Sequence, residues 1–564
     1  GKIVFFSYCY IEIMEKFDAI IIGSGAGGLS TALCLARSGQ KVLVLEQHYV
    51  PGGWCHTFTL NGQRFSPGVH YIGLLDEGQS TNDLYKGLGI ANDLTFFRMN
   101  KNGYDHCIIG NQKFDLPAGI DNLQNKLIEA FPKEEKNIKE YLSLIQKVNY
   151  ELQLMPKLKG LWQKITVPFR TKHFGKFALF SLKRVIGWHI KDPMLQAILN
   201  AQCGDHGLPP SQACFPVHCS VMNHYFDGGF YPMGGGSSIV KTMTSKIKSY
   251  GGEIRVSQKV AKIIVENNQA KGVVLATGET ILANTIVSNA DPSITYLKLI
   301  GKENISKKLE KKLSKTKYSV TSIIMFLTLE VDVTKYGIDS GNIWKFKDEN
   351  VDDHFETLTK GNIIEGDKFP ALFISCTTLK DPVSFNGKYH NFEVVTYVDY
   401  DSFKEFNTSE DYHSEAYELF KKKIIEKFLN NMEDLIPNVR NYVVQAELGT
   451  PKTNQFYINS TNGNVYGTNK TLNQVGPFSY KNKTEIENLY LCGASTLSHG
   501  VTGATYSGLA AAAQILNCTS DDLLIKDDSQ KIKIYDAEDS STWSEFVYKK
   551  REDKIRNFKE INLS

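Results

Sequence analysis

The sequence predicts an α/β fold, in which a domain built on a parallel sheet carries an inserted domain of mixed helices and strands. The first apolar run, residues 17–22, leads through a glycine-rich turn into a helix and a second apolar run at 41–45. This strand–helix–strand order is typical of parallel sheets. Strand-like runs at 253–288 and 488–494 return to the same domain, so the segments between them are predicted to form the insertion.

The glycine-rich turn identifies the first domain as a Rossmann-type dinucleotide-binding unit. Gly23-x-Gly25-x-x-Gly28 follows the strand directly and opens a helix that runs through about Arg37, which is the context that this fingerprint requires. The first glycine permits the tight turn, the second lets a pyrophosphate approach the backbone, and the third lets helix and strand pack closely. The helix N-terminus would face the phosphates with unpaired N–H groups. Glu46 ends the second strand, where an acid that binds the ribose is expected.

The composition limits the classes of partner. The chain has 564 residues, 42% of them hydrophobic, which suffices for two domains or more, and its net charge of +3 does not suggest a nucleic-acid partner. Ten cysteines show no CxxC pair and no zinc spacing, so we predict no metal, and buried thiols in a reducing, cytoplasmic compartment. No apolar run reaches the length of a transmembrane helix, about 18 residues. Residues 1–13 are predicted to be an extension that precedes a functional start at Met14.

The chain divides into six predicted segments. Three belong to the dinucleotide-binding domain, two to the substrate domain, and the last is a polar tail. In chain order they are 15–75 (dinucleotide-binding), 76–230 (substrate, with a membrane-contact part), 231–294 (dinucleotide-binding), 295–480 (substrate, with its sheet), 481–518 (dinucleotide-binding) and 519–564 (tail).

Local patterns place the main elements within these segments. A turn signal at Asn61-Gly62 predicts a hairpin of 58–60 with 64–66. Strand-like runs in the substrate domain alternate imperfectly between apolar and polar residues, so we expect an antiparallel sheet with one covered face. These runs lie at 321–329, 372–376 and 393–397. Helices are predicted at 122–130, 238–250, 414–429 and 501–516, and in the basic part of the tail at 548–559.

Residues 154–191 are basic and rich in aromatic side chains. Lysine and arginine interleave there with tryptophan and phenylalanine, including Trp162 and Phe169. Such a segment can insert its rings at the headgroup boundary of a bilayer and meet anionic lipid with its cations, so we predict peripheral contact with a membrane. The alternative is an ordinary domain face with buried rings and solvated lysines, because Pro156 and Pro168 interrupt the helical pattern.

Five short blocks together resemble the FAD-dependent phytoene desaturase and carotenoid isomerase family. The blocks are the glycine turn with Glu46, Gly-Gly-Trp-Cys-His-Thr-Phe at 52–58, Gly-Val-His-Tyr-Ile-Gly at 68–73, Tyr-Pro-Met-Gly-Gly-Gly at 231–236, and Leu-Cys-Gly-Ala at 491–494 with Gly-Ala-Thr at 503–505. Desaturases of this family usually carry arginine after the Gly-Gly pair. Trp54-Cys55-His56 stands here instead, which is similar to the Cys-Cys-His run of the retinol saturase subgroup.

The resemblance implies the two-domain flavoprotein fold shared with amine oxidases, and FAD as the cofactor. In this fold the glycine turn holds the pyrophosphate, the end of the second strand holds the ribose, and the following loop runs along the ribityl chain. A C-terminal helix aims its positive end at the pyrimidine side of the flavin ring. The implied cofactor-binding residues are Gly23, Ser24, Gly25, Gly27, Gly28, Glu46, Gln47, Gly52, Gly53, Trp54, Thr57, Val260, Gly493, Gly503 and Ala504. Because one fingerprint is present, electrons are expected from an external donor, with NAD(P)H bound without its own Rossmann unit as one alternative.

The resemblance also implies the reaction, although the sequence leaves its direction open. The first hypothesis is reduction of a C=C bond in a hydrophobic isoprenoid polyene, as in retinol saturases. The alternatives are carotenoid or phytoene desaturation, carotenoid cis–trans isomerisation, and a flavin-binding protein without turnover. Saturation needs a proton donor within hydrogen-bond reach, and the blocks expected near the ring offer His56, His70, Tyr71, His499 and Tyr506. His70 and Tyr71 are the preferred pair, and a purely structural role is the alternative for each residue.

Overall fold

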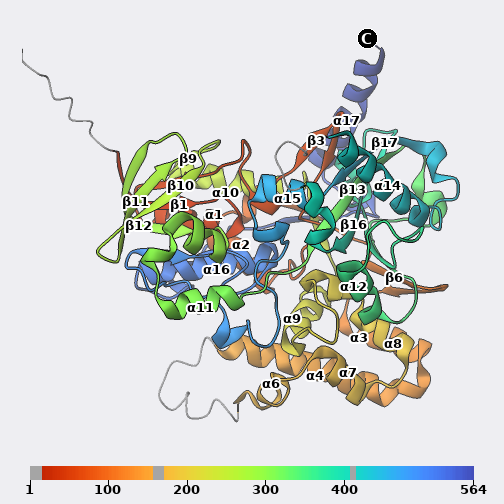
Figure 1. Cartoon of the computed structure of the whole chain (residues 1–564). Helices are drawn as coiled ribbons and strands as arrows, with labels where there is room; N and C mark the ends of the chain where they lie inside the picture. Colours follow the sequence, from red (N-terminus) through yellow and green to blue (C-terminus); the bar gives the residue numbers. More distant parts are fainter. Residues whose placement is uncertain (1–14, 156–169, 407–413, 564) are drawn as a thin grey trace, which may run out of the picture.

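The computed structural model describes residues 15–155, 170–406 and 414–563 (Figure 1). Within these residues it has two large sheets of seven strands each, a sheet of three strands, and the predicted hairpin, β3 (Phe58–Leu60) with β4 (Gln63–Phe65). The first large sheet and its helices form the lobe on the left of Figure 1, and the second sheet lies on the right. The predicted extension before Met14 lies outside the described residues.

The first sheet assembles strands that are far apart in the sequence. They are β1 (Lys16–Ile22), β2 (Val42–Leu45), β9 (Glu253–Arg255), β10 (Val260–Glu266), β11 (Gln269–Leu275), β12 (Thr280–Ser288) and β18 (Leu489–Leu491). The order is β10-β11-β12-β1-β2-β9, and β18 pairs with β12. The pairs β12–β1, β1–β2, β2–β9 and β12–β18 are parallel. Strands β10, β11 and β12 form an antiparallel meander. The chain thus leaves this sheet and returns to it, which confirms the inserted domain. The six segment boundaries stay a prediction.

Helices α1 (Ala26–Arg37), α10 (Ser237–Ser249) and α16 (Gly500–Ile515) share one apolar core with this sheet. The alanine-rich helix α16 packs closely on α1. A Cβ on Gly508 would meet the carbonyl oxygen of Gly27 at 2.0 Å, so the two backbones touch. Ser30 and Thr31 of α1 also donate hydrogen bonds to carbonyl oxygens of α16 at 2.8 and 2.9 Å. The first half of α1 therefore lies against the middle of α16.

The second sheet carries strands from both predicted substrate segments. They are β6 (Asp105–Ile109), β7 (Gln112–Leu116), β13 (Thr321–Leu329), β14 (Asn342–Phe346), β15 (Ala371–Cys376), β16 (His390–Val398) and β17 (Val443–Gly449), in the order β17-β13-β16-β15-β14-β6-β7. Neighbours are antiparallel except β14 and β6. The expectation of one covered face is wrong, because β13 is buried along all nine of its residues. Its centre is an unbroken apolar run, which is typical of a strand covered on both faces.

A layer of helices lies below the second sheet in Figure 1. It holds α3 (Ile120–Ala130), α4 (Glu135–Leu154), α6 (Lys172–Phe177), α7 (Leu182–His189), α8 (Pro193–Asn200) and α9 (Phe215–Tyr225). Further helices lie elsewhere in the described residues. They are α2 (Ser80–Leu88), α11 (Lys307–Lys315), α12 (Val351–Lys360), α13 (Thr377–Lys380), α14 (Glu415–Met432) and α15 (Pro451–Ile458). Trp162 and Phe169 of the predicted membrane segment lie outside the described residues. None of the helices within the described ranges is long and apolar enough to span a bilayer.

The C-terminal tail folds onto the rest of the chain, which its polar composition did not predict. Strand β19 (Lys533–Asp536) pairs with β5 (Thr95–Arg98), and β5 pairs on its other edge with β8 (Phe230–Pro232). Trp543 packs edge-on against Phe97, with ring centroids 5.9 Å apart. The predicted basic helix is confirmed as part of α17 (Glu545–Leu563), which projects from the top of the molecule (Figure 1).

Candidate active site

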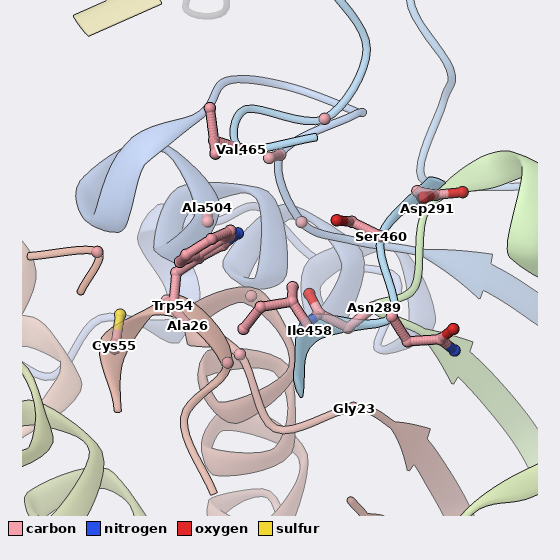
Figure 2. A pocket seen from close by; sticks show the side chains of 18 of the residues that line it. Gly23, Ala26, Trp54, Cys55, Asn289, Asp291, Ile458, Ser460, Val465 and Ala504 are labelled. Atoms are coloured by element: carbon pink, nitrogen blue, oxygen red, sulfur yellow. The ribbon is translucent and has the colours of Figure 1, made fainter. Parts of the chain in front are cut away.

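A cavity of about 300 Å³ is lined by residues of both large sheets. Its first end lies at the glycine turn and the carboxyl ends of β1, β2 and β12, as Figure 2 shows, and its second end is bordered by β13, β15 and β16. Most of the predicted site residues meet at this cavity. The lining includes Gly23, Ser24, Gly25, Gly27, Glu46, Gln47, Gly52, Gly53, Trp54, His70, Val260, Gly493 and Ala504.

The glycine turn forms a cradle that side chains would fill. Gly23 has a φ of +93°, which L side chains rarely adopt. A Cβ on Gly25 would lie 2.7 Å from the amide nitrogen of Asn289, and a Cβ on Gly27 would lie 2.7 Å from its amide oxygen. Asn289, which is not among the predicted site residues, lies against the turn and lines the same cavity (Figure 2). The backbone N–H groups at the start of α1, bordered by glycines, suit an anionic diphosphate.

Glu46 closes the first end of the cavity and is tied to the same turn. Its Oε2 accepts the backbone N–H of Ser24 at 2.9 Å and the Ser24 hydroxyl at 2.5 Å. The backbone N–H of His48 donates to Oε1 at 2.9 Å. Ser24 in turn accepts the backbone N–H of Gly52 at 2.9 Å, which fixes the following loop to the turn. The carboxylate is 6% exposed and borders the cavity, so it is placed to accept hydrogen bonds from a ribose.

The loop after β2 brings Trp54 into the cavity. Gly52 and Gly53 have φ values of +129° and +55°, so this turn depends on glycine at both positions. A Cβ on Gly53 would also lie 3.2 Å from the Cα of Gly25, because the loop crosses the glycine turn closely. Figure 2 shows the indole of Trp54 beside Ala504 in the first turn of α16.

Three predicted cofactor residues do not line the cavity. Gly28 lies behind the turn, where a Cβ would meet the carbonyl oxygen of Gly23 at 2.1 Å, so its role is close packing. The hydroxyl of Thr57 donates to the Ser237 hydroxyl at 2.7 Å. Gly503 packs against Ser498, where a Cβ would lie 2.8 Å from the Ser498 Cβ. Contact of these three residues with a cofactor stays a prediction.

His70 places a titratable ring at the second end of the cavity. Its Nδ1–H donates to Oε2 of Glu393 at 3.0 Å. The other carboxylate oxygen of Glu393 accepts the backbone N–H of Ser66 at 2.6 Å, and Glu393 is completely buried on β16. A carboxylate held on one ring nitrogen fixes the tautomer and the orientation of a histidine. Nε2 is therefore the ring nitrogen of His70 that can meet a ligand.

Tyr71 lies behind the cavity wall and bridges two carboxyl groups. Its hydroxyl donates to Asp205 at 2.7 Å and lies 3.2 Å from Asp105. Burial, with the charge of Asp105, raises the pKa of Asp205 to about 8, and burial raises the pKa of Asp105 to about 6. Burial raises the pKa of Tyr71 well above its usual value, so the phenol keeps its proton. Asp205 lines the cavity, whereas Tyr71 does not.

A buried lysine holds the backbone under the two predicted catalytic residues. Lys380 has no exposed surface, and its ammonium donates to the carbonyl oxygen of His70 at 2.7 Å, to the Ser375 hydroxyl at 2.7 Å and to Asn342. Burial lowers the pKa of Lys380 to about 7, and the charge of Glu393 opposes that shift. Sequence reasoning missed Lys380, because no local motif marks it.

The remaining predicted catalytic residues, His499, His56 and Tyr506, each make a hydrogen bond to a backbone carbonyl oxygen. His499 donates from Nε2 to the carbonyl oxygen of Asp205 at 2.8 Å, and burial lowers the pKa of His499 to about 3. Nδ1 of His56 lies 2.7 Å from the carbonyl oxygen of Gly53, and burial lowers its pKa as well. The Tyr506 hydroxyl donates to the carbonyl oxygen of Ser80 at 3.1 Å. These three residues lie outside the cavity lining.

Comparisons with known proteins agree on a family. A family model described as "Flavin containing amine oxidoreductase" matches residues 26–516. The all-trans-retinol 13,14-reductase of Danio rerio is 30% identical over 530 residues, covering 90% of this chain and 87% of the relative. Prolycopene isomerase 2 of an Oncidium hybrid cultivar is 26% identical over 527 residues, covering 90% of this chain and 84% of the relative.

A solved structure shows the same fold at low identity. Cyclohexylamine oxidase from Brevibacterium oxydans matches with a TM-score of 0.56 at 13% identity, covering 89% of this chain and 99% of that one. The predicted amine oxidase-like fold and the resemblance to retinol saturases and carotenoid isomerases are thereby confirmed. Because the family model matches most of the chain, this protein is an oxidoreductase that belongs to the flavin-containing amine oxidoreductase family.

Proposed function

We propose that this protein uses FAD to add two hydrogens across a C=C bond of a hydrophobic isoprenoid polyene, as the name of the all-trans-retinol 13,14-reductases states for those relatives. The observation that carries the proposal is one continuous cavity. It joins the glycine turn and Glu46 to an apolar end that contains His70. A cofactor at the first end and a polyene at the second would share the same enclosed space.

The first end of the cavity fits FAD. The backbone of Gly23, Gly25 and Gly27 would bind the pyrophosphate, and Glu46 would accept hydrogen bonds from the adenosine ribose. FAD bound there would supply two electrons and one hydrogen to the substrate. The single fingerprint supports an external electron donor, with NAD(P)H bound outside a Rossmann unit as the alternative. The cytoplasmic location of the protein stays a prediction.

The second end of the cavity suits a long apolar molecule. Its walls include Ile324 of β13, Trp344 of β14, Phe373 of β15 and Val395 of β16. Such a wall excludes water and orients an unsaturated chain by shape, with few polar contacts. Tyr397 and Asp205 are polar groups at this end, and they could meet a terminal hydroxyl.

His70 is the best-placed proton donor for the second carbon of the double bond. The Glu393 carboxylate accepts Nδ1–H of His70, so a proton carried on Nε2 would face the ligand side of the ring. Tyr71 acts through Asp205, which its hydroxyl holds at the cavity wall. Lys380 supports both residues by fixing the carbonyl oxygen of His70.

An anaerobic incubation with a panel of polyenes tests the proposed reaction. The holoprotein is first reduced, then mixed with all-trans-retinol, a colourless carotenoid precursor or a cis-carotenoid. We expect absorption at shorter wavelength, because saturation shortens the conjugated system. In a second arm, in which the flavin is left oxidised and can accept two electrons, absorption at longer wavelength would mean desaturation. A shifted retention time with unchanged conjugation would mean isomerisation, the second candidate, which the similarity to prolycopene isomerase favours. No change with any polyene would indicate a flavin-binding protein without turnover.

We also propose that the helical layer contacts a membrane surface from which the polyene enters. Two large apolar side chains are unusually exposed there, Leu179 at 75% and Trp188 at 47%. The guanidinium carbon of Arg184 lies 5.4 Å from the ring centroid of Phe180 and 5.8 Å from that of Trp188. Exposed aromatic rings beside a cation suit the boundary between the headgroups and acyl chains of an anionic bilayer.

Liposome flotation tests the membrane contact. The wild-type protein should float with anionic vesicles at low salt, and Leu179→Ser with Trp188→Ser should lower the bound fraction several-fold, because the apolar anchors are lost. The control is Leu419→Ser with Val444→Ser, which removes exposed apolar side chains at 52% and 47% on α14 and β17, away from the helical layer. Equal flotation of the two double variants would refute the contact.

A further inference from the structure

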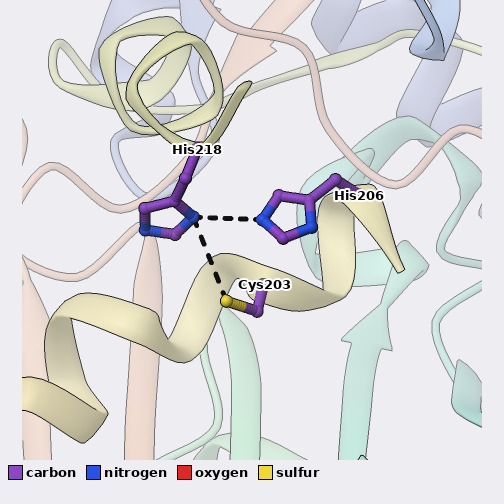
Figure 3. A group of neighbouring side chains, drawn as sticks. All are labelled: Cys203, His206 and His218. Atoms are coloured by element: carbon purple, nitrogen blue, oxygen red, sulfur yellow. Dashed lines mark hydrogen bonds between the residues drawn. The ribbon is translucent and has the colours of Figure 1, made fainter. Parts of the chain in front are cut away.

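A cysteine and two histidines converge in the buried interior behind the second end of the cavity (Figure 3). Cys203 and His206 lie on the 3₁₀ turn Ala201–His206, and His218 lies on α9. None of the three side chains has exposed surface. Nε2 of His206 lies 3.2 Å from Nδ1 of His218, and Sγ of Cys203 lies 4.0 Å from the same nitrogen. All three ligand atoms lie within 4.8 Å of one another.

We propose that these three residues bind a zinc ion. Zinc takes imidazole nitrogen at about 2.0 Å and thiolate sulfur at about 2.3 Å in tetrahedral geometry, which separates its ligand atoms by about 3.3 to 3.6 Å. The observed separations from Nδ1 of His218 bracket these values. The ion would contact His206 through Nε2, His218 through Nδ1 and Cys203 through Sγ. The spacing of the cysteines, taken alone, predicted no metal. The proposed zinc site would therefore correct that prediction.

The hydrogen bond on the far side of His218 prepares its ring for a metal. Nε2–H of His218 donates to the carbonyl oxygen of Leu199 at 3.0 Å. The neutral ring then has its lone pair on Nδ1, the atom that faces Cys203 and His206. A ligating histidine typically donates its other ring N–H to a carbonyl or carboxylate in this way.

Two buried polar atoms beside the cluster have no hydrogen-bond partner among the described residues. One is Nδ1 of His206, and the other is the hydroxyl of Tyr141. Tyr141 is completely buried, and the thiols of Cys219 and Cys203 both lie close enough to interact with it electrostatically. Leaving a buried hydroxyl unpaired costs about 1–3 kcal/mol. A Cys203 thiolate, which exists in an apolar interior when a metal neutralises it, would give the Tyr141 hydroxyl an acceptor.

The proposed ion would fix a wall of the substrate cavity. The turn that carries Cys203 and His206 also carries Asp205, which lines the cavity. The carbonyl oxygen of Gly204 in this turn accepts the hydroxyl of Tyr466 at 2.9 Å, and that of Tyr397. A zinc ion shared with His218 would anchor the turn to α9 and hold these wall residues in place.

Metal analysis of the purified holoprotein tests the site without an activity measurement. The protein is expressed with added zinc, or exposed to Zn²⁺ alone and then desalted. We expect about one zinc ion per chain, which is the stoichiometry of a single structural site. Cys203→Ser should reduce the zinc content at least five-fold while flavin content is unchanged. The matched control is Cys219→Ser, which removes another completely buried thiol, next to His218 on α9 and outside the cluster.

If Cys203→Ser folds poorly, a second variant and the absorption spectrum of a cobalt-substituted protein test the same site. His206→Asn should also lose zinc while its flavin is retained. Cobalt added to wild-type protein freed of zinc should give visible absorption of tetrahedral Co²⁺ at wavelengths longer than those of the flavin. Wild-type protein with less than a tenth of an equivalent of zinc after exposure, or Cys203→Ser and His206→Asn with as much zinc as wild type, would overturn the site and leave a hydrogen-bonded histidine pair.

Discussion

Replacing His70 by alanine is expected to lower polyene turnover by about 10²-fold or more while flavin content stays at the wild-type level, because general acid catalysis contributes a factor of this order. The ring is at the substrate end of the cavity, and its partner Glu393 is buried beneath it. His70→Ala removes the proposed proton donor and leaves the cofactor end untouched. Turnover is followed by loss of polyene absorption under anaerobic conditions.

Tyr71→Phe is the comparison for His70→Ala. It removes only the hydroxyl that holds Asp205 at the wall, so we expect a smaller loss of turnover than for His70→Ala and a raised KM for the polyene. Tyr506→Phe serves as a control, since the Tyr506 hydroxyl donates to the carbonyl oxygen of Ser80 and Tyr506 lies outside the cavity lining. Near-normal turnover in His70→Ala would assign this residue a packing role and remove it from the mechanism.

Gly25→Val is expected to abolish flavin binding. A Cβ at this position would lie 2.7 Å from the amide nitrogen of Asn289, so the valine side chain would force Asn289 and the turn apart. The backbone of this turn is proposed to bind the pyrophosphate, and the added methyl groups would take up room that the pyrophosphate needs. The purified variant should be colourless, with no FAD released on denaturation. A thermal unfolding measurement shows whether the variant is folded.

Gly187→Val is the matched control for Gly25→Val. Gly187 lies on α7, and a Cβ there would meet no atom within 4 Å. This variant should keep its yellow colour and full FAD content. If Gly25→Val also bound FAD at the wild-type level, the placement of the pyrophosphate on the glycine turn would be wrong.

The dinucleotide end of the site was predictable because its signals are local. The spacing of Gly23, Gly25 and Gly28 encodes one turn, and Glu46 follows in the same strand–helix–strand unit. The structure places Gly23, Gly25 and Glu46 on one cavity. Asn289 completes the cradle, but it comes from the end of β12, and no local pattern marks it as a partner of the turn.

The substrate end was less predictable because its contacts span long distances in the sequence. Lys380 supports His70 from 310 positions away, and Glu393 binds the same histidine from 323 positions away. A buried lysine and glutamate carry no motif, since their partners are set by how β13, β15 and β16 pack. The wrong expectation that one face of the sheet is exposed has the same origin. Whether β13 is covered on one face or both depends on elements that pack against it from elsewhere in the chain, and the sequence of the strand does not specify them.

The measurement that tests the central claim most directly is an anaerobic single turnover in which flavin and polyene are followed together. Holoprotein reduced with a stoichiometric amount of dithionite is mixed with all-trans-retinol. The proposed function predicts that the absorption of oxidised flavin returns as the polyene loses conjugation, with one product two hydrogens heavier formed for each flavin reoxidised. Flavin that stays reduced in the presence of retinol and of every other polyene in the panel, or a polyene that changes geometry without reoxidation of the flavin, would contradict the account.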